Sequence, residues 1–191
     1  MTVRIVMVCH GSTEALRRAA FPLDEGLDEH GTKQVADAAH LFAPAGAESS
    51  SALCGPSLRC RQTAAGLGVT AETDEGLRDC DTGHWAGRTL ADLRVEDPEG
   101  MTAWLTDPAA APHGGESVLT LVGRVAAWLE SRHEAGGRVV AITHPAVIRA
   151  AVVHVLGTPP EAFWKIDAEP LSHVRLTAHG GRWRLRLSQA S

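Results

Sequence analysis

The sequence predicts an α/β fold of three layers, in which a mostly parallel central sheet lies between helices on both faces. Two observations lead to this prediction. Short apolar runs of strand length alternate with segments whose apolar residues recur at helical spacing. Two of these runs, Val3–Cys9 and Arg138–Thr143, are each followed by a histidine that precedes a helix start. Because parallel strands need crossover helices, this alternation is typical of a sheet covered on both faces.

Apolar spacing and breaker residues define the individual elements. After the first strand, Ser12 or Thr13 can cap a helix. The elements expected after it are a helix over Thr32–Phe42, a linker over Ala43–Ser50, a strand over Ser51–Cys54, helices over Leu58–Leu67 and Ser117–His133, the strand over Arg138–Thr143, a helix over Pro145–Leu156 and a hairpin of Leu171–Ala178 and Arg182–Ser188.

Residues 74–112 interrupt this alternation. They are rich in glycine and proline, and helical pieces are expected only near Leu90–Val95 and Met101–Leu105. We therefore expect one domain over residues 1–191, with residues 74–112 as a small lid or insertion.

Charge and cysteine content restrict the class of protein. The 191 residues carry a formal net charge of −5, which argues against nucleic acid or an acidic membrane as the main partner. The four cysteines have no CxxC spacing, as expected for reduced thiols in the cytoplasm. The apolar runs are too short for a signal peptide or a membrane span. We expect a cytoplasmic protein, monomeric or homodimeric, that acts on a small molecule.

The two strand-end histidines, His10 and His144, are the first indication of chemistry. His10 stands at the end of the first strand and is followed by Gly11 and possible helix-capping residues. His144 repeats this placement, with Pro145 at the first turn of the next helix. The carboxyl ends of parallel strands are where ligands bind in α/β sheets, and helix-start amides attract anions. The pair therefore indicates a site for phosphate chemistry.

Five motifs in this order and spacing resemble those of the histidine phosphatase superfamily, which has the phosphoglycerate-mutase-like fold. They are Cys9-His10-Gly11, Gly55–Ala64 (GPSLRCRQTA), Leu77–Gly87 (LRDCDTGHWAG), Gly114–Ser117 (GGES) and Ile142–Pro145 (ITHP). Any one motif is weak evidence, but five in order are strong. The resemblance extends over nearly the whole chain, from residue 3 to about residue 187.

The resemblance implies a role for each residue of the site. His10 would take the phosphoryl group, and Arg59 would clamp its oxygens in bidentate fashion. His144 would donate to the same oxygens, while Asp79 would protonate the leaving oxygen and then deprotonate the attacking water. Further candidates for substrate binding are Cys9, Gly11, Thr13 and Glu116. The chemistry requires no metal and no cofactor.

Other interpretations remain open for several of these residues. Arg59 can form an ordinary salt bridge. Asp79 competes with Asp81 for the catalytic role, or pairs only with Arg78. Glu116 can simply favour the N-terminus of the long helix. For the remaining histidines near the expected lid, His84 and His113, exposure in a loop is the better expectation.

Cys9 departs from the family pattern, which has an arginine before the nucleophilic histidine. A thiol supplies neither charge nor forked donors, so the anion site loses about 1.5–3 kcal/mol of binding. One of three other arginines, Arg17, Arg18 or Arg61, can take this role, or the ligand carries less charge than a phosphomonoester. In a simpler interpretation, Cys9 is a small apolar residue at a strand end.

The function that these patterns favour is a phosphohydrolase that acts on a small phosphorylated metabolite through a phosphohistidine intermediate. A mutase is less favoured because the expected lid offers few basic residues. Three alternatives stay open: a lyase, isomerase or other hydrolase that uses the same pocket, a non-catalytic anion-binding module, and an enzyme with Cys9 as nucleophile. Alkylation at near-neutral pH would reveal a reactive Cys9.

Overall fold

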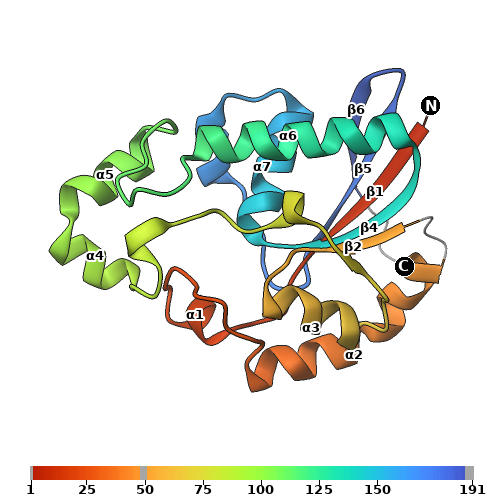
Figure 1. Ribbon diagram of the computed structural model, residues 1–191, viewed down its shortest axis with the longest axis horizontal. Coiled ribbons are helices and arrows are strands. Elements are labelled where there is room, and N and C mark those ends of the chain that lie inside the picture. Colours follow the sequence, from red (N-terminus) through yellow and green to blue (C-terminus); the bar gives the residue numbers. More distant parts are fainter. Residues whose placement is uncertain (1, 48–50, 188–191) are drawn as a thin grey trace.

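A mixed six-stranded sheet forms the centre of the computed structural model, which describes residues 2–47 and 51–187 (Figure 1). The strands are β1 (Thr2–Cys9), β2 (Ser51–Cys54), β3 (Glu72–Thr73), β4 (Gly137–Thr143), β5 (His173–His179) and β6 (Arg182–Arg186), in the order β3-β2-β4-β1-β5-β6. Neighbours among β1 to β4 pair in parallel, whereas β5 pairs antiparallel with β1 and with β6. This confirms the predicted α/β class and its mostly parallel sheet.

Helices cover both faces of the sheet, as predicted. The α-helices are α1 (Glu14–Arg17), α2 (Glu29–Ala47), α3 (Leu58–Gly66), α4 (Leu90–Glu96), α5 (Pro98–Thr106), α6 (Val118–Ala135) and α7 (Pro145–Leu156), and the 3-10 helices are η1 (Glu75–Leu77), η2 (Gly83–Trp85) and η3 (Pro160–Lys165). Figure 1 shows α6 and α7 on one side of the sheet and α2 and α3 on the other. Within the described residues, no helix combines the length and apolar character needed to cross a membrane.

The alternation of side chains along β1 builds two separate cores. Ile5, Met7 and Cys9 are buried in a cluster with residues of α6 and α7. Val8 belongs instead to a cluster with residues of α2 and α3. Successive side chains of a strand point to opposite faces, so residue 9 faces α6 and α7. This direction matters for the site, because Cys9 precedes the first strand-end histidine.

The segment 74–112 carries its own small core at one end of the sheet. Phe21, Trp85, Leu93 and Met101 are buried together in a third cluster. Backbone hydrogen bonds join this segment to the chain after α1, among them Phe21 N–H to the Arg88 carbonyl at 2.9 Å. In Figure 1, α4 and α5 extend beyond the sheet beside α1. The segment therefore forms a wall at the ligand-binding edge.

Several predicted boundaries need correction. The helix expected over Thr32–Phe42 begins at Glu29, because the Asp28 carboxylate accepts a hydrogen bond from Gly31 N–H. It continues to Ala47, so residues 43–47 of the expected linker are helical, while 48–50 lie outside the described residues. Alanines at three of these five positions favour the helix, whereas Pro44 and Gly46, on which the expected linker rested, oppose it. The second hairpin strand ends at Arg186, and the expected end at Ser188 lies outside the described residues.

Candidate active site

The parallel pairing of β1 with β4 brings the two strand-end histidines together. Cys9 and Thr143 are in register at the ends of these strands, so the next residues are His10 and His144. The His10 backbone N–H donates to the Thr143 carbonyl at 2.9 Å and fixes this arrangement. The two imidazole rings are edge to face, with centroids 5.3 Å apart. The sequence prediction of a shared site at this sheet edge agrees with the geometry.

His10 is held in the tautomer that a nucleophile requires. Its Nδ1 lies 2.8 Å from the Gly11 carbonyl oxygen. A carbonyl only accepts, so Nδ1 carries the proton and Nε2 keeps a free lone pair. Burial, with the cationic His144 nearby, lowers the pKa of His10 to about 3. His10 is therefore neutral and nucleophilic at physiological pH.

Arg59 and Asp79 form an ion pair beside His10. Arg59 lies in the first turn of α3, after the N-cap Ser57, and its side chain is 4% exposed. One guanidinium nitrogen donates to the Leu23 carbonyl at 2.8 Å, and the other donates to Asp79 Oδ2, also at 2.8 Å. Arg59 Nε is buried and has no partner. The expected salt bridge thus exists, but it leaves donors of Arg59 unused.

His144 forms the other side of this charged cluster. Its Nδ1 lies 3.2 Å from Asp79 Oδ2, so the two side chains form an ion pair. Burial alone would lower the pKa of His144, but the Asp79 carboxylate and the nearby Cys60 thiol raise it to about 9. Burial would likewise raise the pKa of Asp79, yet His144 and Arg59 hold it well below its usual range. In the free protein, Asp79 is ionised and His144 is cationic.

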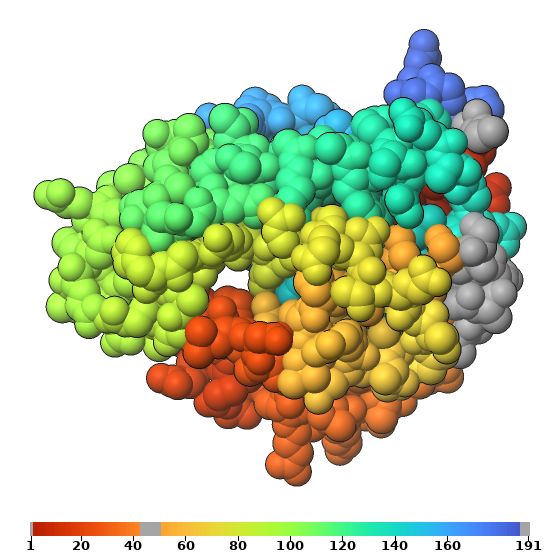
Figure 2. Space-filling model, in the orientation of Figure 1, coloured from red at the N-terminus to blue at the C-terminus, as the bar shows by residue number. Residues whose placement is uncertain are grey.

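A cavity of about 250 Å³ opens beside these residues. Figure 2 shows the surface hollowed between the red segment that holds α1 and the yellow segment that follows β3. The polar lining residues are His10, Thr13, Arg59, Asp79, Cys80, Thr82 and Arg149. The rest of the lining is apolar and includes Leu16, Phe21, Leu90, Trp104, Val118 and Phe163. His144 does not line the cavity; it lies behind Asp79 and His10 and is fully buried.

The other predicted substrate-binding residues have structural partners. Thr13 lines the cavity and caps α1 by accepting from Leu16 N–H. Gly11 N–H donates to the Thr63 hydroxyl at 3.0 Å, so its amide is already engaged. Glu116 receives two 2.8 Å hydrogen bonds from Arg124 and does not line the cavity.

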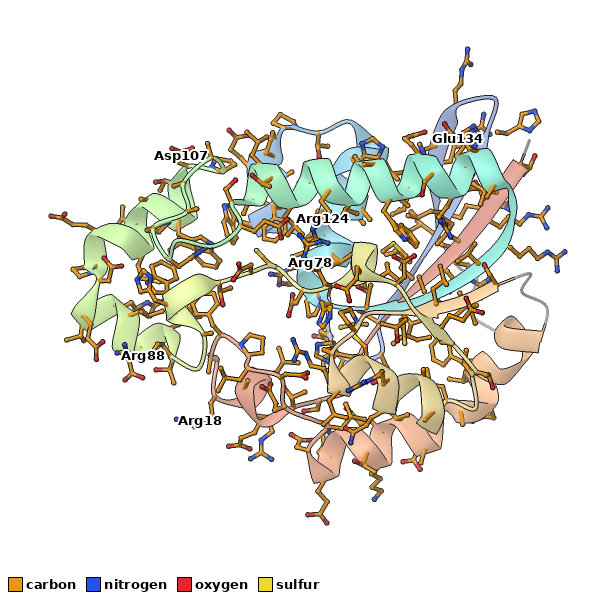
Figure 3. The ribbon with its side chains drawn as sticks, viewed as in Figure 1. Arg18, Arg78, Arg88, Asp107, Arg124 and Glu134 are labelled. Carbon is orange, nitrogen blue, oxygen red and sulfur yellow. The ribbon has the colours of Figure 1, made fainter. Side chains whose placement is uncertain are left out.

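Arg124 ties this region together. Besides Glu116, its guanidinium donates to backbone carbonyls of Gly76, Arg78 and Asp79. Figure 3 shows Arg124 and Arg78 close together beneath α6. These bonds fix the loop segment that carries Asp79 to α6. This arrangement favours a structural role for Glu116. The alternative in which Asp79 pairs with Arg78 loses support, because the Arg78 guanidinium lies 3.8 Å from the Glu116 carboxylate instead.

Cys9 is buried and does not line the cavity. Its Sγ lies 4.0 Å from the Ala168 carbonyl oxygen. Burial, with the neighbouring Cys60 and Asp79, raises the pKa of the Cys9 thiol far above its usual range. The alternative in which Cys9 acts as a nucleophile loses support. The small apolar residue of the simpler interpretation agrees with this packing.

The arginines expected to compensate for Cys9 lie elsewhere. Arg17 pairs with Glu14 at 3.2 Å, and Arg61 is exposed on α3. Arg18 is exposed and lies at the outer edge of the molecule (Figure 3). None of the three lines the cavity. Arg149 does line the cavity, and sequence reasoning missed it. Its position one turn into the helix that follows His144 is the signal that could have identified it.

The two remaining histidines near the segment 74–112, His84 and His113, differ in their exposure to solvent. His84 is exposed, as predicted. His113 is only 1% exposed, so the expectation of a solvent-exposed loop histidine was wrong. Its ring packs against Trp85 with centroids 5.2 Å apart, and its Nδ1 accepts from Gly115 N–H. Asp81, the competitor of Asp79, accepts from Gly83 N–H and does not line the cavity.

Comparison with known proteins agrees with this fold. The model of the histidine phosphatase superfamily (branch 1) matches residues 5–191. A glucosyl-3-phosphoglycerate phosphatase of Mycobacterium tuberculosis is 31% identical, over 98% of this chain and 95% of that protein. One of Mycolicibacterium vanbaalenii is 29% identical with the same coverage.

Solved structures share the fold of this chain. A mycobacterial glucosyl-3-phosphoglycerate phosphatase complexed with VO3 superposes with a TM-score of 0.83 at 28% identity, over 98% of this chain and 99% of that chain. The phosphoserine phosphatase of Entamoeba histolytica reaches a TM-score of 0.86 over 99% and 98% of the two chains, but at 18% identity it supports the fold alone. The chain thus belongs to the histidine phosphatase superfamily, branch 1, which confirms the predicted family and enzyme class.

Proposed function

We propose that this phosphohydrolase cleaves a small phosphomonoester through a phosphohistidine formed on His10. One observation carries the proposal: Arg59 Nε, a buried N–H donor without a partner, and the cationic His144 both lie near the neutral His10. Buried donors are normally satisfied, so unpartnered ones call for an explanation. A phosphoryl group at His10 would supply the missing acceptor oxygens.

The proposed first step transfers the phosphoryl group to the enzyme. The Nε2 lone pair of His10 attacks phosphorus, and the P–N bond forms as the bond to the ester oxygen breaks. The leaving oxygen takes the proton of the Asp79 carboxyl group, which lines the same cavity. The cations Arg59 and His144 stabilise the charge on the equatorial oxygens.

The second step restores the free enzyme. Water attacks phosphorus, its proton passes to the Asp79 carboxylate, and the P–N bond breaks. Phosphate leaves, and His10 regains the neutral form that its hydrogen bond to the Gly11 carbonyl favours. The proton that Asp79 takes up when substrate binds returns to solvent as phosphate departs, so the cycle consumes one water and balances.

Asp79 must change its protonation state for this cycle. In the free protein its pKa is low, because Arg59 and His144 stabilise the carboxylate. A bound phosphomonoester draws both cations to its own oxygens and places negative charge beside Asp79. Both effects raise the pKa of Asp79, so substrate binding is accompanied by proton uptake.

The wider setting follows from the residues described. All four cysteines are free thiols, which supports a cytoplasmic location. The net charge of −5 supports a small molecule rather than nucleic acid as partner. The segment 74–112 packs on the cavity wall through Phe21, which supports one domain with a lid.

The decisive experiment is to trap the intermediate. Turnover of a 4-nitrophenyl phosphate carrying ³²P in the phosphoryl group is stopped in alkali, and the label on the protein is located by peptide mapping. We expect alkali-stable, acid-labile label on His10 in the wild type and in His40→Ala, a control on the exposed face of α2. His10→Ala should carry none and should lose turnover. Label on another residue, or full activity in a folded His10→Ala protein, would overturn the proposal.

A further inference from the structure

Arg149 is a partly buried cation without an anionic partner. It lies on α7 one turn after Pro145 and lines the cavity together with His10 and Arg59. Its Nε is buried and makes no hydrogen bond, and no described carboxylate pairs with it. Its guanidinium carbon lies 5.7 Å from the centroid of Phe163. Desolvating part of an unpaired charge is costly, so such a residue at a cavity wall indicates an anion that enters the cavity.

Arg149 approaches the sheet from the side to which residue 9 points. The Cys9 side chain belongs to the core formed with α6 and α7. The positive charge of Arg149 acts on this thiol and opposes the effect of burial on its pKa. The side chains of residue 9, on β1, and Arg149, on α7, thus lie toward the same region beside His10. The resemblance places an arginine at residue 9, and the structure places one at residue 149.

We propose that Arg149 binds the phosphoryl group as its second arginine, opposite Arg59, and supplies from α7 the charge that residue 9 lacks. The proposal rests on the proposed function, because it assumes a phosphoryl group at His10. It gives the unpartnered Nε an acceptor and the guanidinium a counter-charge. It also accounts for a phosphatase that has a thiol next to its nucleophile.

The main alternative is that Arg149 binds a carboxylate elsewhere on the substrate. Inorganic phosphate and vanadate separate the two interpretations, because neither ligand has a carboxylate. Their affinities are measured by calorimetry for the wild type, for Arg149→Gln and for Arg184→Gln, a matched control at an exposed position of the edge strand β6.

We expect Arg149→Gln to weaken phosphate and vanadate binding by about tenfold to a hundredfold, the range for one lost charge-assisted contact. Arg184→Gln should bind like the wild type. Wild-type affinity in Arg149→Gln would overturn the proposal. Labelling of His10 in the trapping experiment does not depend on this result, so the two proposals fail separately.

Thermal stability distinguishes ligand binding from a structural role. Replacing an unpaired, partly buried cation by an apolar side chain of similar length removes a desolvation cost. Arg149→Met should therefore raise the Tm of the free protein and reduce the Tm increase caused by saturating phosphate. A lower Tm together with an unchanged phosphate-induced increase would show that Arg149 is structural.

The remaining lining carries a second inference, about the alcohol part of the substrate. Beyond the residues around His10, the cavity wall consists mainly of Leu16, Phe21, Leu90, Trp104, Val118 and Phe163. With Arg59 and Arg149 on the phosphoryl group, no lysine or further arginine among the described residues lines the cavity to hold a carboxylate. We infer that the leaving group is uncharged and largely apolar. This differs from the phosphoglycerate-bearing substrates named for the mycobacterial relatives.

A matched pair of esters tests this second inference, which also assumes hydrolysis at His10. We expect kcat/KM for 4-methylphenyl phosphate to exceed that for 4-carboxyphenyl phosphate at least tenfold, because burying the carboxylate against this wall is unfavourable. Leu16→Arg adds a cation at a wall position that is 39% exposed, so the fold should tolerate it. That variant should narrow or reverse the preference. Equal or better turnover of the carboxylated ester by the wild type would refute the inference.

Discussion

Asp79→Asn separates proton transfer from charge placement, because the proposed mechanism gives the carboxylate both roles. It lies 2.8 Å from Arg59 Nη2 and 3.2 Å from His144 Nδ1. The amide keeps the size of the side chain but can neither give up a proton to an ester oxygen nor balance two cations. Two separate effects are therefore expected, one on the leaving group and one on the pH dependence.

The effect on the leaving group follows from general acid catalysis, which contributes about 10²–10⁴-fold. An alkyl phosphate needs protonation of its leaving oxygen, whereas 4-nitrophenyl phosphate needs little. Asp79→Asn should reduce kcat for benzyl phosphate by about 10²–10⁴-fold, with a much smaller loss for 4-nitrophenyl phosphate. Stopped assays of phosphate release on both esters give the ratio. Equal losses on the two would refute the assignment of Asp79 as the proton donor.

The effect on pH dependence concerns His144. Its pKa of about 9 in the folded protein depends on Asp79, while burial opposes the charged form. In the wild type, the cationic His144 should be lost as pH rises through about 9, and vanadate affinity should fall there. In Asp79→Asn, burial dominates and the fall should begin at least two pH units lower. An unchanged basic limb in this variant would show that Asp79 does not control His144.

Linkage gives a stability readout of the same pair. A raised pKa in the folded state means that the stabilising contribution of His144 is fully present below about 6.5, its unfolded value, and is lost as pH rises through about 9. Chemical denaturation between these pH values should show the wild type losing up to about 1.4 kcal/mol per pH unit from this group. Asp79→Asn should lose this slope, which distinguishes the pair from surface titrations.

Two further predictions concern residues that support the site. Gly31→Ala should lower the free energy of unfolding and kcat, because a Cβ there would come within 2.1 Å of the Ser12 carbonyl oxygen in the loop after His10. The control Gly123→Ala on α6, where a Cβ meets nothing within 4 Å, should gain about 0.5–1 kcal/mol of stability in denaturant titrations. A stabilised Gly31→Ala protein would contradict this prediction. Cys9→Ala should keep phosphatase activity. In the wild type, Cys9 should resist iodoacetamide at pH 7.5 until the protein unfolds, because the thiol is buried and its pKa is raised. Rapid alkylation of Cys9 in the native protein, measured by peptide mass, would show that it is a reactive group.

The sequence predicted the parts of the fold in which local signals and burial agree. The strand before His10 and the helix Pro145–Leu156 have strong apolar runs and clear breakers, and both match the structure closely. The boundaries that failed depend on capping side chains. The helix expected near Met101–Leu105 begins at Pro98, because Asp97 accepts from Gly100 N–H and proline suits the first turn. That Asp-Pro signal is visible in the sequence.

The site shows a different limit of sequence reasoning. Motif order indicated which residues meet, and parallel pairing of β1 with β4 brings His10 and His144 to one edge. Motif order does not give the direction of a side chain or its competing partners. Glu116 lies in a recognised motif, yet Arg124 engages both of its carboxylate oxygens. Such a pairing between residues eight positions apart depends on how the loop before α6 packs.

Arg149 illustrates why a departure from a motif must be judged in three dimensions. Cys9 and Arg149 are 140 positions apart, and only the packing of α7 on the face of β1 that carries Cys9 brings them into one region. A cation needed at a phosphoryl group can be supplied from any element that reaches the same volume, because charge and donor geometry matter rather than chain position. The loss of an arginine next to the nucleophile therefore does not imply a loss of phosphatase chemistry. What decides is whether an unpaired guanidinium faces the same cavity, and Arg149 meets that condition.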